Sequence, residues 1–92
     1  MNLEIDRLKA AIEKFDLGTY NEMEFHKTLQ SIAPLVTESH LSKLRNFLFD
    51  LEADLEIIDF TAAESLKRNR YSEKIKDLKR YLEDINLRGI NL

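Results

Sequence analysis

The chain has 92 residues, of which 43% are hydrophobic and 34% charged, and its net charge is −3. This length allows one domain with a modest core, and the composition suits a soluble globular protein. Because the chain has no cysteine, a disulfide scaffold, a cysteine-based zinc site and a thiol nucleophile are excluded. The N-terminus lacks the features of a signal peptide, and no stretch approaches the ~20 apolar residues of a membrane span. We therefore expect a cytoplasmic protein that does not enter membranes.

The first predicted helix covers residues 3–16. Asn2 can cap its start, and Gly18 ends it by supplying the left-handed conformation that a helix C-terminus favours. Its apolar residues recur at helical spacing on one face: Ile5, Leu8, Ile12 and Phe15. With only two glycines and one proline in the chain, long helices are favoured over a β fold.

The second predicted helix covers residues 20–33. Thr19 and Glu22 have the spacing of a capping box, in which each side chain accepts a hydrogen bond from the backbone of the other residue. Pro34 should stop the helix near Ile32, because proline removes a backbone donor and restricts the residue before it.

The third predicted helix covers residues 38–59, with Thr37 as its cap, and organises the fold. It carries two apolar stripes at helical spacing. The first consists of Leu41, Leu44, Leu48, Leu51, Leu55 and Ile58; the second consists of Phe49, Ala53, Ile57 and Phe60. Two stripes indicate a hub helix buried on two sides. If three short neighbours cannot cover both, the second stripe would be an interface with a partner or a second copy.

A fourth helix is predicted over residues 62–86, followed by a tail at 87–92. Its apolar residues are Tyr71, Ile75, Leu78, Leu82 and Ile85, which are one residue out of phase with the preceding seam. A second capping box, formed by Thr61 and Glu64, lies at the break. The pattern predicts an all-α fold, a small and mainly antiparallel four-helix bundle.

Acidic residues fill the gaps between the two stripes of the third helix: Asp50, Glu52, Asp54, Glu56 and Asp59. Like charges four residues apart destabilise a helix, so something outside it should compensate. One interpretation is internal: Lys67 and Lys74 of the fourth helix could meet these acids. The other is a largely exposed docking surface for a basic protein.

The fourth helix is rich in basic residues, and residues 61–92 carry a net charge of +3 against −6 for residues 1–60. The bases are Lys67, Arg68, Arg70, Lys74, Lys76, Lys79 and Arg80. Acids are interleaved with them, and pairs such as Lys79–Glu83 favour a solvated helix linked by ion pairs. The alternative is a site for RNA, DNA or another polyanion.

Motifs for catalysis or metal binding are not found. His26 lies four residues after Glu22, whereas di-iron bundles use a Glu-x-x-His motif twice with two further glutamates. The interpretation we favour for His26 is a surface contact with Glu22. No nucleophile turn or phosphate-binding glycine loop occurs, so we expect no enzyme, metal or cofactor.

These observations predict a non-catalytic module that binds a protein, with the acidic residues or an uncovered stripe as its interface. Its size and charge are compatible with an immunity-like or antitoxin-like protein that covers a basic partner. The alternatives are polyanion binding by the basic helix and a homodimeric structural protein.

Overall fold

The computed structural model describes residues 3–87, and its order of elements agrees with the predicted all-α bundle. The elements are α1 (Leu3–Asp16), α2 (Glu22–Ile32), the short 3₁₀ helices η1 (Ala33–Leu35) and η2 (Ser39–Leu41), α3 (Ser42–Thr61) and α4 (Glu64–Leu87). The predicted cap at Asn2 and the tail at 88–92 lie outside the described residues.

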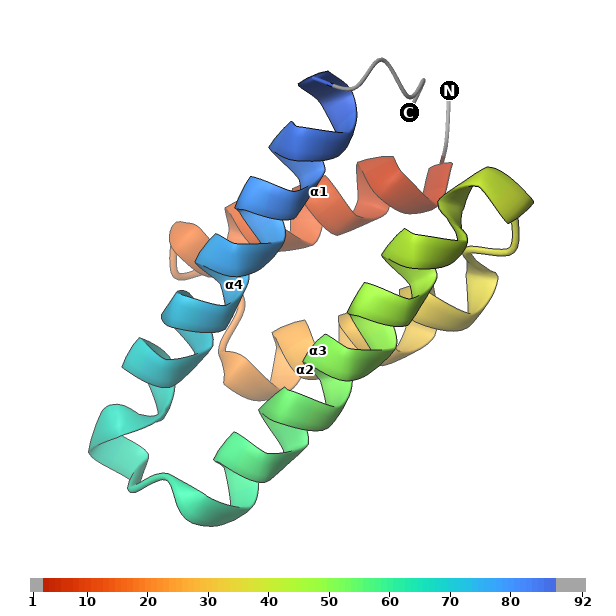
Figure 1. The fold of residues 1–92 in the computed structure, drawn as a ribbon. Helices are drawn as coiled ribbons and strands as arrows, with labels where there is room; N and C mark the ends of the chain where they lie inside the picture. The colour runs from red at the N-terminus through yellow and green to blue at the C-terminus, as the bar shows by residue number, and fades with distance from the viewer. Residues whose placement is uncertain (1–2, 88–92) are drawn as a thin grey trace.

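Two helical hairpins make up the bundle (Figure 1). α1 packs against α2, and α3 packs against α4, with α2 and η1 also contacting α3. In Figure 1 the turn that joins α3 to α4 lies at the lower left, and α1 and α2 lie behind this hairpin. α3 thus packs against both α2 and α4.

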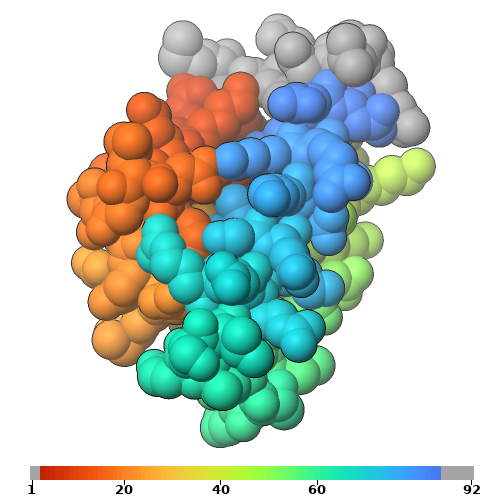
Figure 2. Space-filling view, turned by 90° about the vertical axis from the view of Figure 1, so that its left-hand side faces the viewer, coloured from red at the N-terminus to blue at the C-terminus, as the bar shows by residue number. Residues whose placement is uncertain are grey.

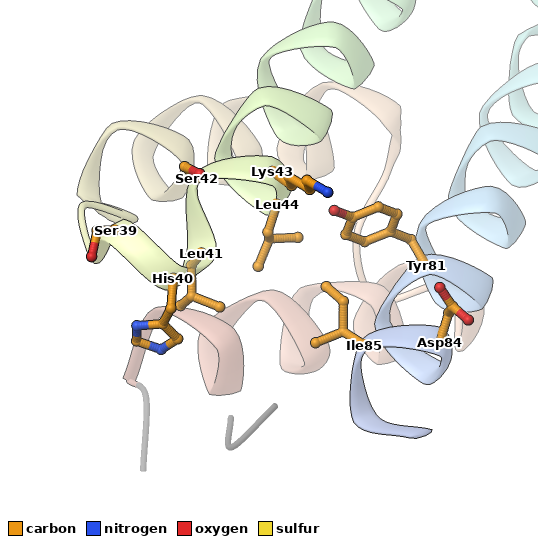
Figure 3. A pocket seen from close by; sticks show the side chains of 9 residues that line it. All are labelled: Ser39, His40, Leu41, Ser42, Lys43, Leu44, Tyr81, Asp84 and Ile85. Carbon is orange, nitrogen blue, oxygen red and sulfur yellow. The ribbon is translucent and has the colours of Figure 1, made fainter. Parts of the chain in front are cut away.

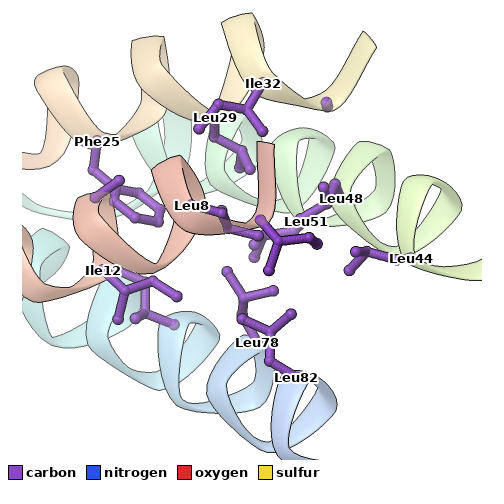
Figure 4. Packing of buried hydrophobic residues seen from close by; sticks show 14 of the residues in the cluster. Leu8, Ile12, Phe25, Leu29, Ile32, Leu44, Leu48, Leu51, Leu78 and Leu82 are labelled. Carbon is purple, nitrogen blue, oxygen red and sulfur yellow. The ribbon is translucent and has the colours of Figure 1, made fainter. Parts of the chain in front are cut away.

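The core is built from the helical stripes that the sequence predicts (Figure 4). The first stripe of α3 is buried from Leu41 to Leu55, and Ile58 is partly buried. All five predicted apolar residues of α4, from Tyr71 to Ile85, are also buried. The buried apolar stripe therefore does shift by one residue between α3 and α4, near residue 60. α3 ends at Thr61 and α4 begins at Glu64, which confirms the predicted turn.

The helix starts differ from the predictions. The capping box of α2 is formed by Asn21 and Glu24, with backbone-to-side-chain distances of 3.0 and 2.8 Å, and not by Thr19 and Glu22. Thr19 cannot serve as the cap because its amide still donates to Lys14 O, at 2.9 Å, in the turn that closes α1. Gly18 has the predicted left-handed φ, +82°.

Two further caps were predicted wrongly. α3 begins at Ser42 rather than after Thr37, because a short extended segment and η2 come first. Thr61 does not cap α4, since its hydroxyl donates instead to Ile57 O within α3, at 2.7 Å. Pro34 does end α2 at Ile32, as predicted, and lies in η1.

The second stripe of α3 is not buried. Its residues Phe49, Ala53, Ile57 and Phe60 are all exposed. The interpretation of α3 as buried on two sides is therefore wrong, because neither α2 nor α4 covers this face. No helix among residues 3–87 is both long enough and apolar enough to span a bilayer.

Candidate functional site

Two of the five acids of α3 point inward, toward a buried histidine of α2. His26 Nε2 lies 3.0 Å from Glu52 Oε1, and His26 Nδ1 lies 2.9 Å from Asp59 Oδ2. The hydroxyl of Tyr71 on α4 donates to Asp59 Oδ1 at 2.6 Å, and Gln30 donates to Glu52 at 2.8 Å. These five side chains form a polar cluster, called here the His26 cluster, that joins α2, α3 and α4.

The surroundings in the His26 cluster shift the pKa of two of its groups, Glu52 and Tyr71. Hydrogen bonds from Gln30 and then from His26 hold the pKa of Glu52 below its usual range. Burial, and then the bond to Asp59, raise the pKa of Tyr71, which keeps its hydroxyl as a neutral donor.

The His26 cluster has the character of a structural bond between helices. His26 is only 8% exposed, and none of the cavities described below is lined by its ring. Among residues 3–87, no group of three acidic, histidine or cysteine side chains has an arrangement that could hold a metal ion. The predicted surface contact between His26 and Glu22 is therefore wrong, since His26 turns inward to α3.

The other three acids lie on the outer side of α3. Asp54 is half-exposed and pairs with Lys74 of α4 at 3.3 Å. Asp50 and Glu56 are exposed, and within the described residues neither has an ion-pair partner. The five acids are thus not one exposed surface. Glu52, Asp54 and Asp59 have partners inside the fold, which leaves Asp50 and Glu56 available to solvent.

The exposed stripe of α3 lies between these two remaining acids. Phe49, Ile57 and Phe60 are 40%, 59% and 83% exposed, and exposed Ala53 lies between Phe49 and Ile57. We call Phe49, Ala53, Ile57 and Phe60 the α3 stripe. Arg45 lies over the Phe49 ring, with its guanidinium carbon 5.4 Å from the ring centroid.

At its C-terminal end the α3 stripe continues into the turn between the two helices. Leu66 of α4 is 47% exposed there. A cavity of about 540 Å³, called here the turn cavity, is lined by Ile57, Ile58, Thr61, Ala62, Ala63, Leu66 and Arg70. Figure 2 shows that this turn forms the lower end of the molecule. The apolar surface is therefore continuous from the middle of α3 to the tip of the hairpin.

Most of the bases predicted as a polyanion site are used inside the fold. Lys67, Lys74, Lys79 and Arg80 pair with Glu64, Asp54, Asp16 and Asp77, respectively. Lys74 thus pairs with one acid of α3. Lys79 and Arg80 pair with Asp16 and Asp77, and not with the acids four residues further along α4. Arg70 and Lys76 are exposed and have no ion pair within residues 3–87.

Arg68 has a role that the sequence pattern did not indicate. Its guanidinium donates to Phe15 O and to Tyr20 O, the latter at 3.4 Å, and lies 4.0 Å above the Phe15 ring centroid. It therefore adds donors to one carbonyl in the last turn of α1, that of Phe15, and to one directly before α2, that of Tyr20. A base engaged in this way is not presented to a polyanion.

A second region of the surface is hollowed at the start of α3 (Figure 3). This cavity, of about 360 Å³, has an apolar floor of Leu41, Leu44 and Ile85. Its polar lining consists of Ser39, His40, Ser42, Lys43, Tyr81 and Asp84. In Figure 3 the Tyr81 ring points from α4 toward the start of α3, while His40 lies at the far edge. Lys43 and Tyr81 point toward one another in this view, whereas Ser39 and His40 lie on the far side of the cavity.

The sequence contained a signal for the His26 cluster that the spacing argument missed. His26 directly follows the buried Phe25, and the next apolar residue on that face is Leu29, so the imidazole lies beside the buried side of α2. Tyr71 likewise occupies a core position of α4. A polar atom at each of two core positions requires partners, and acids of the hub helix provide them.

Comparison with protein-family models, with curated proteins and with solved structures found no match to this chain.

Proposed function

We propose that this chain is a non-catalytic protein-binding module that holds a basic partner protein against the exposed face of α3. The observation that carries the proposal is the α3 stripe itself, where Phe60 is 83% and Ile57 59% exposed. Contiguous apolar side chains of this size are unfavourable in water and mark interaction surfaces more often than isolated ones do. The stripe repeats at helical spacing, as an interface on a helix requires.

The charges beside the stripe support a basic partner. Asp50 and Glu56 flank it, are exposed, and are left without ion pairs in the described fold. Acids that repel their neighbours on the helix weaken it slightly, and a cationic partner would relieve that repulsion. A cytoplasmic, immunity-like role, in which the module covers a basic protein, belongs to this proposal and rests on the same charges together with the absence of cysteine.

Three features support binding rather than catalysis or polyanion binding. The titratable groups of the His26 cluster bond to one another and line none of the cavities described above. In the cavity at the start of α3, Ser39 and His40 lie across from Tyr81. Five of the seven bases of the basic helix have partners within the fold, so the electrostatic footprint that a nucleic acid needs is reduced.

The test begins with capture from the source cells on immobilised wild-type protein, beside an Ile57→Asp/Phe60→Asp variant. The control is Leu17→Asp/Met23→Asp, which places the same two charges on apolar residues outside α3 that are 73% and 59% exposed. All three must first give the same helical circular dichroism and unfolding midpoint. The expected result is one protein retained by wild type and control and lost from the Ile57→Asp/Phe60→Asp variant.

The captured protein is then identified and purified, and its binding site is mapped by amide hydrogen exchange. Protection along residues 49–60 in a defined complex would support the proposal. A protein that binds wild type and the stripe variant equally well would overturn it, because the interface would then lie elsewhere. Recovery of the module alone, or only with a second copy of itself, would also overturn it.

A further inference from the structure

We infer that the partner segment seated on the α3 stripe is an amphipathic helix with lysine or arginine at its centre. This inference rests on the proposed function and adds the shape and charge of the occupant. An uncovered helical stripe is matched in protein complexes by another helix whose apolar residues have the same spacing. An extended strand is not favoured, since α3 offers a helical surface and no free strand edge.

The length of the occupant follows from the stripe. Phe49 and Phe60 are separated by eleven residues, which span about 16 Å of helix axis. A partner helix of about three turns covers this distance. Ala53 lies between the larger Phe49 and Ile57, so a large apolar side chain of the partner has room at the middle of the stripe. The turn cavity beside Ile57 receives the next anchor, at the end of the hairpin.

The charges around the α3 stripe determine where along its length the partner helix should carry charged residues. Acids flank the stripe, where Asp50 and Glu56 are exposed, and bases lie near its two ends, with Arg45 over Phe49 and Arg70 at the turn cavity. A complementary helix therefore carries bases at its centre and none at its ends.

A basic side chain of the partner also has a place to lie. Next to Asp50, between α3 and α4, is a cavity of about 260 Å³ with Phe47 and Leu51 in its lining. Lys74 also lines this cavity and pairs with Asp54 there, while Asp77 pairs with Arg80. The Asp50 carboxylate is the one left to receive a lysine or arginine head, while the apolar lining receives its aliphatic stem.

The same pattern argues against a second copy of this chain as the occupant. In a two-fold antiparallel pairing centred on Ala53, Asp50 of one copy faces Glu56 of the other. Arg45 would meet the Arg70 end of the other copy. Registers shifted toward the C-terminal end of α3 give no relief, because α3 has no base from Asn46 to Phe60. Acids therefore oppose acids in each of these pairings.

The test uses two synthetic helical peptides of 18 residues with leucines at alternating spacings of three and four. One peptide carries lysines beside the leucines in its central turns, and the other carries glutamates at the same positions. Binding is measured by fluorescence anisotropy, and the site is mapped by NMR shifts of the module. The lysine peptide should bind along α3 about tenfold more tightly than the glutamate peptide, and the difference should shrink as salt rises.

The matched variants are Asp50→Lys/Glu56→Lys and a control, Asp6→Lys/Glu13→Lys. The control makes the same change of net charge at exposed acids of α1. The first variant should reverse the preference and favour the glutamate peptide, whereas the control should keep the preference of the wild type. A preference that changes equally in both variants would overturn the inference, because it would reflect net charge alone.

Failure of this inference is distinguishable from failure of the proposed function. Equal binding of both peptides along α3, or capture of a partner that is lost from the stripe variant but kept by Asp50→Lys/Glu56→Lys, would overturn the basic helix and leave the α3 stripe as an interface. Absence of binding by either peptide at 1 mM (about 4 kcal/mol of binding free energy) would overturn the helical occupant. A partner that binds the wild type and the Ile57→Asp/Phe60→Asp variant equally well would overturn both this inference and the proposed function.

Discussion

At the scale of single residues, His26 is the polar group on which the packing of three helices depends. Its two ring nitrogens lie within hydrogen-bond distance of Glu52 and Asp59, and the Tyr71 hydroxyl donates to the same Asp59. The residue is only 8% exposed, so these contacts replace water that the imidazole and the carboxylates would otherwise bind. The acids of α3 are thus divided by what α2 and α4 place opposite them, and not by their spacing along the helix.

Substitution His26→Leu should lower the free energy of unfolding by about 2–3 kcal/mol, because two partly buried carboxylates lose their donors. The value is below that for a fully buried ion pair, since the side chains of Glu52 and Asp59 remain 21% and 33% exposed. Urea unfolding measures it, with exposed His40→Leu as the control that should change stability by less than ~0.5 kcal/mol. A loss no larger than that of the control would show that the cluster contributes nothing.

The stability of the protein should depend on pH through Glu52. Hydrogen bonds from Gln30 and His26 hold the pKa of Glu52 below its ordinary value of 4.5. A folded pKa below the unfolded one gives stability that is fully present above the unfolded pKa and is lost as pH falls through the folded pKa. The wild type should therefore exceed Glu52→Gln in unfolding free energy at pH 7, and the difference should shrink below pH 4.5. Urea titrations across pH 3–7 check this, and a constant difference would contradict it.

At the scale of one element, α3 carries charges that its own stability does not favour. Asp50 and Asp54 lie four residues apart, as do Glu52 and Glu56, and each like-charge pair costs roughly 0.2–0.5 kcal/mol in a helix. Lys74 compensates Asp54, and His26 compensates Glu52. Asp50 and Glu56 are repelled by the acids four residues away and have no ion-pair partner among the described residues.

The double substitution Asp50→Asn/Glu56→Gln should therefore stabilise the isolated protein, by about 0.5–1 kcal/mol in the free energy of unfolding. Stability gained by removing a surface charge is typical of positions retained for binding. Thermal and urea unfolding at low salt measure the gain, which should decrease when salt screens the charges. A loss of stability would mean that these acids have favourable contacts within the fold.

At the scale of the whole molecule, Arg68 joins the two hairpins. It reaches from α4 to the Phe15 carbonyl in the last turn of α1 and to the Tyr20 carbonyl in the connection to α2, and it stacks on the Phe15 ring. Arg68→Met keeps the apolar stem but removes the donors, so we expect a loss of about 1.5–3 kcal/mol in the free energy of unfolding. Arg70→Met, at an exposed position two residues away, is the matched control and should have little effect. Equal effects of the two substitutions would contradict the bridging role.

The contrast between these two arginines shows which parts of the molecule the sequence could predict. Helical spacing predicted the buried stripes of α1 and α4 and the first stripe of α3, because burial follows the 3.6-residue period. It also predicted the turn near residue 61 from a one-residue change of register. It could not separate Arg68 from Arg70, or Glu52 from Glu56, because the partners come from elements distant in sequence. The caps failed for a local reason, since Thr19 still closes α1 and Asn21 is the first residue free to begin α2.

The last consequence concerns the state of the whole molecule in solution. An exposed stripe of Phe49, Ile57 and Phe60 would by itself favour self-association. The acids beside it oppose this, because every two-fold pairing of α3 considered above brings like charges together. At low salt we therefore expect a monomer of 10.8 kDa at micromolar concentration, measured by sedimentation equilibrium.

The response to salt concentration distinguishes self-association from binding of a basic partner. High salt screens the acid–acid repulsion, so dimerisation should become stronger, whereas a complex with a cationic helix should become weaker. Asp50→Asn/Glu56→Gln should raise self-association at low salt for the same reason, and Phe60→Asp should abolish it. A dimer at low salt that dissociates as salt rises would mean that opposite charges meet across the stripe, and the α3 face would then be an interface between two copies of this chain.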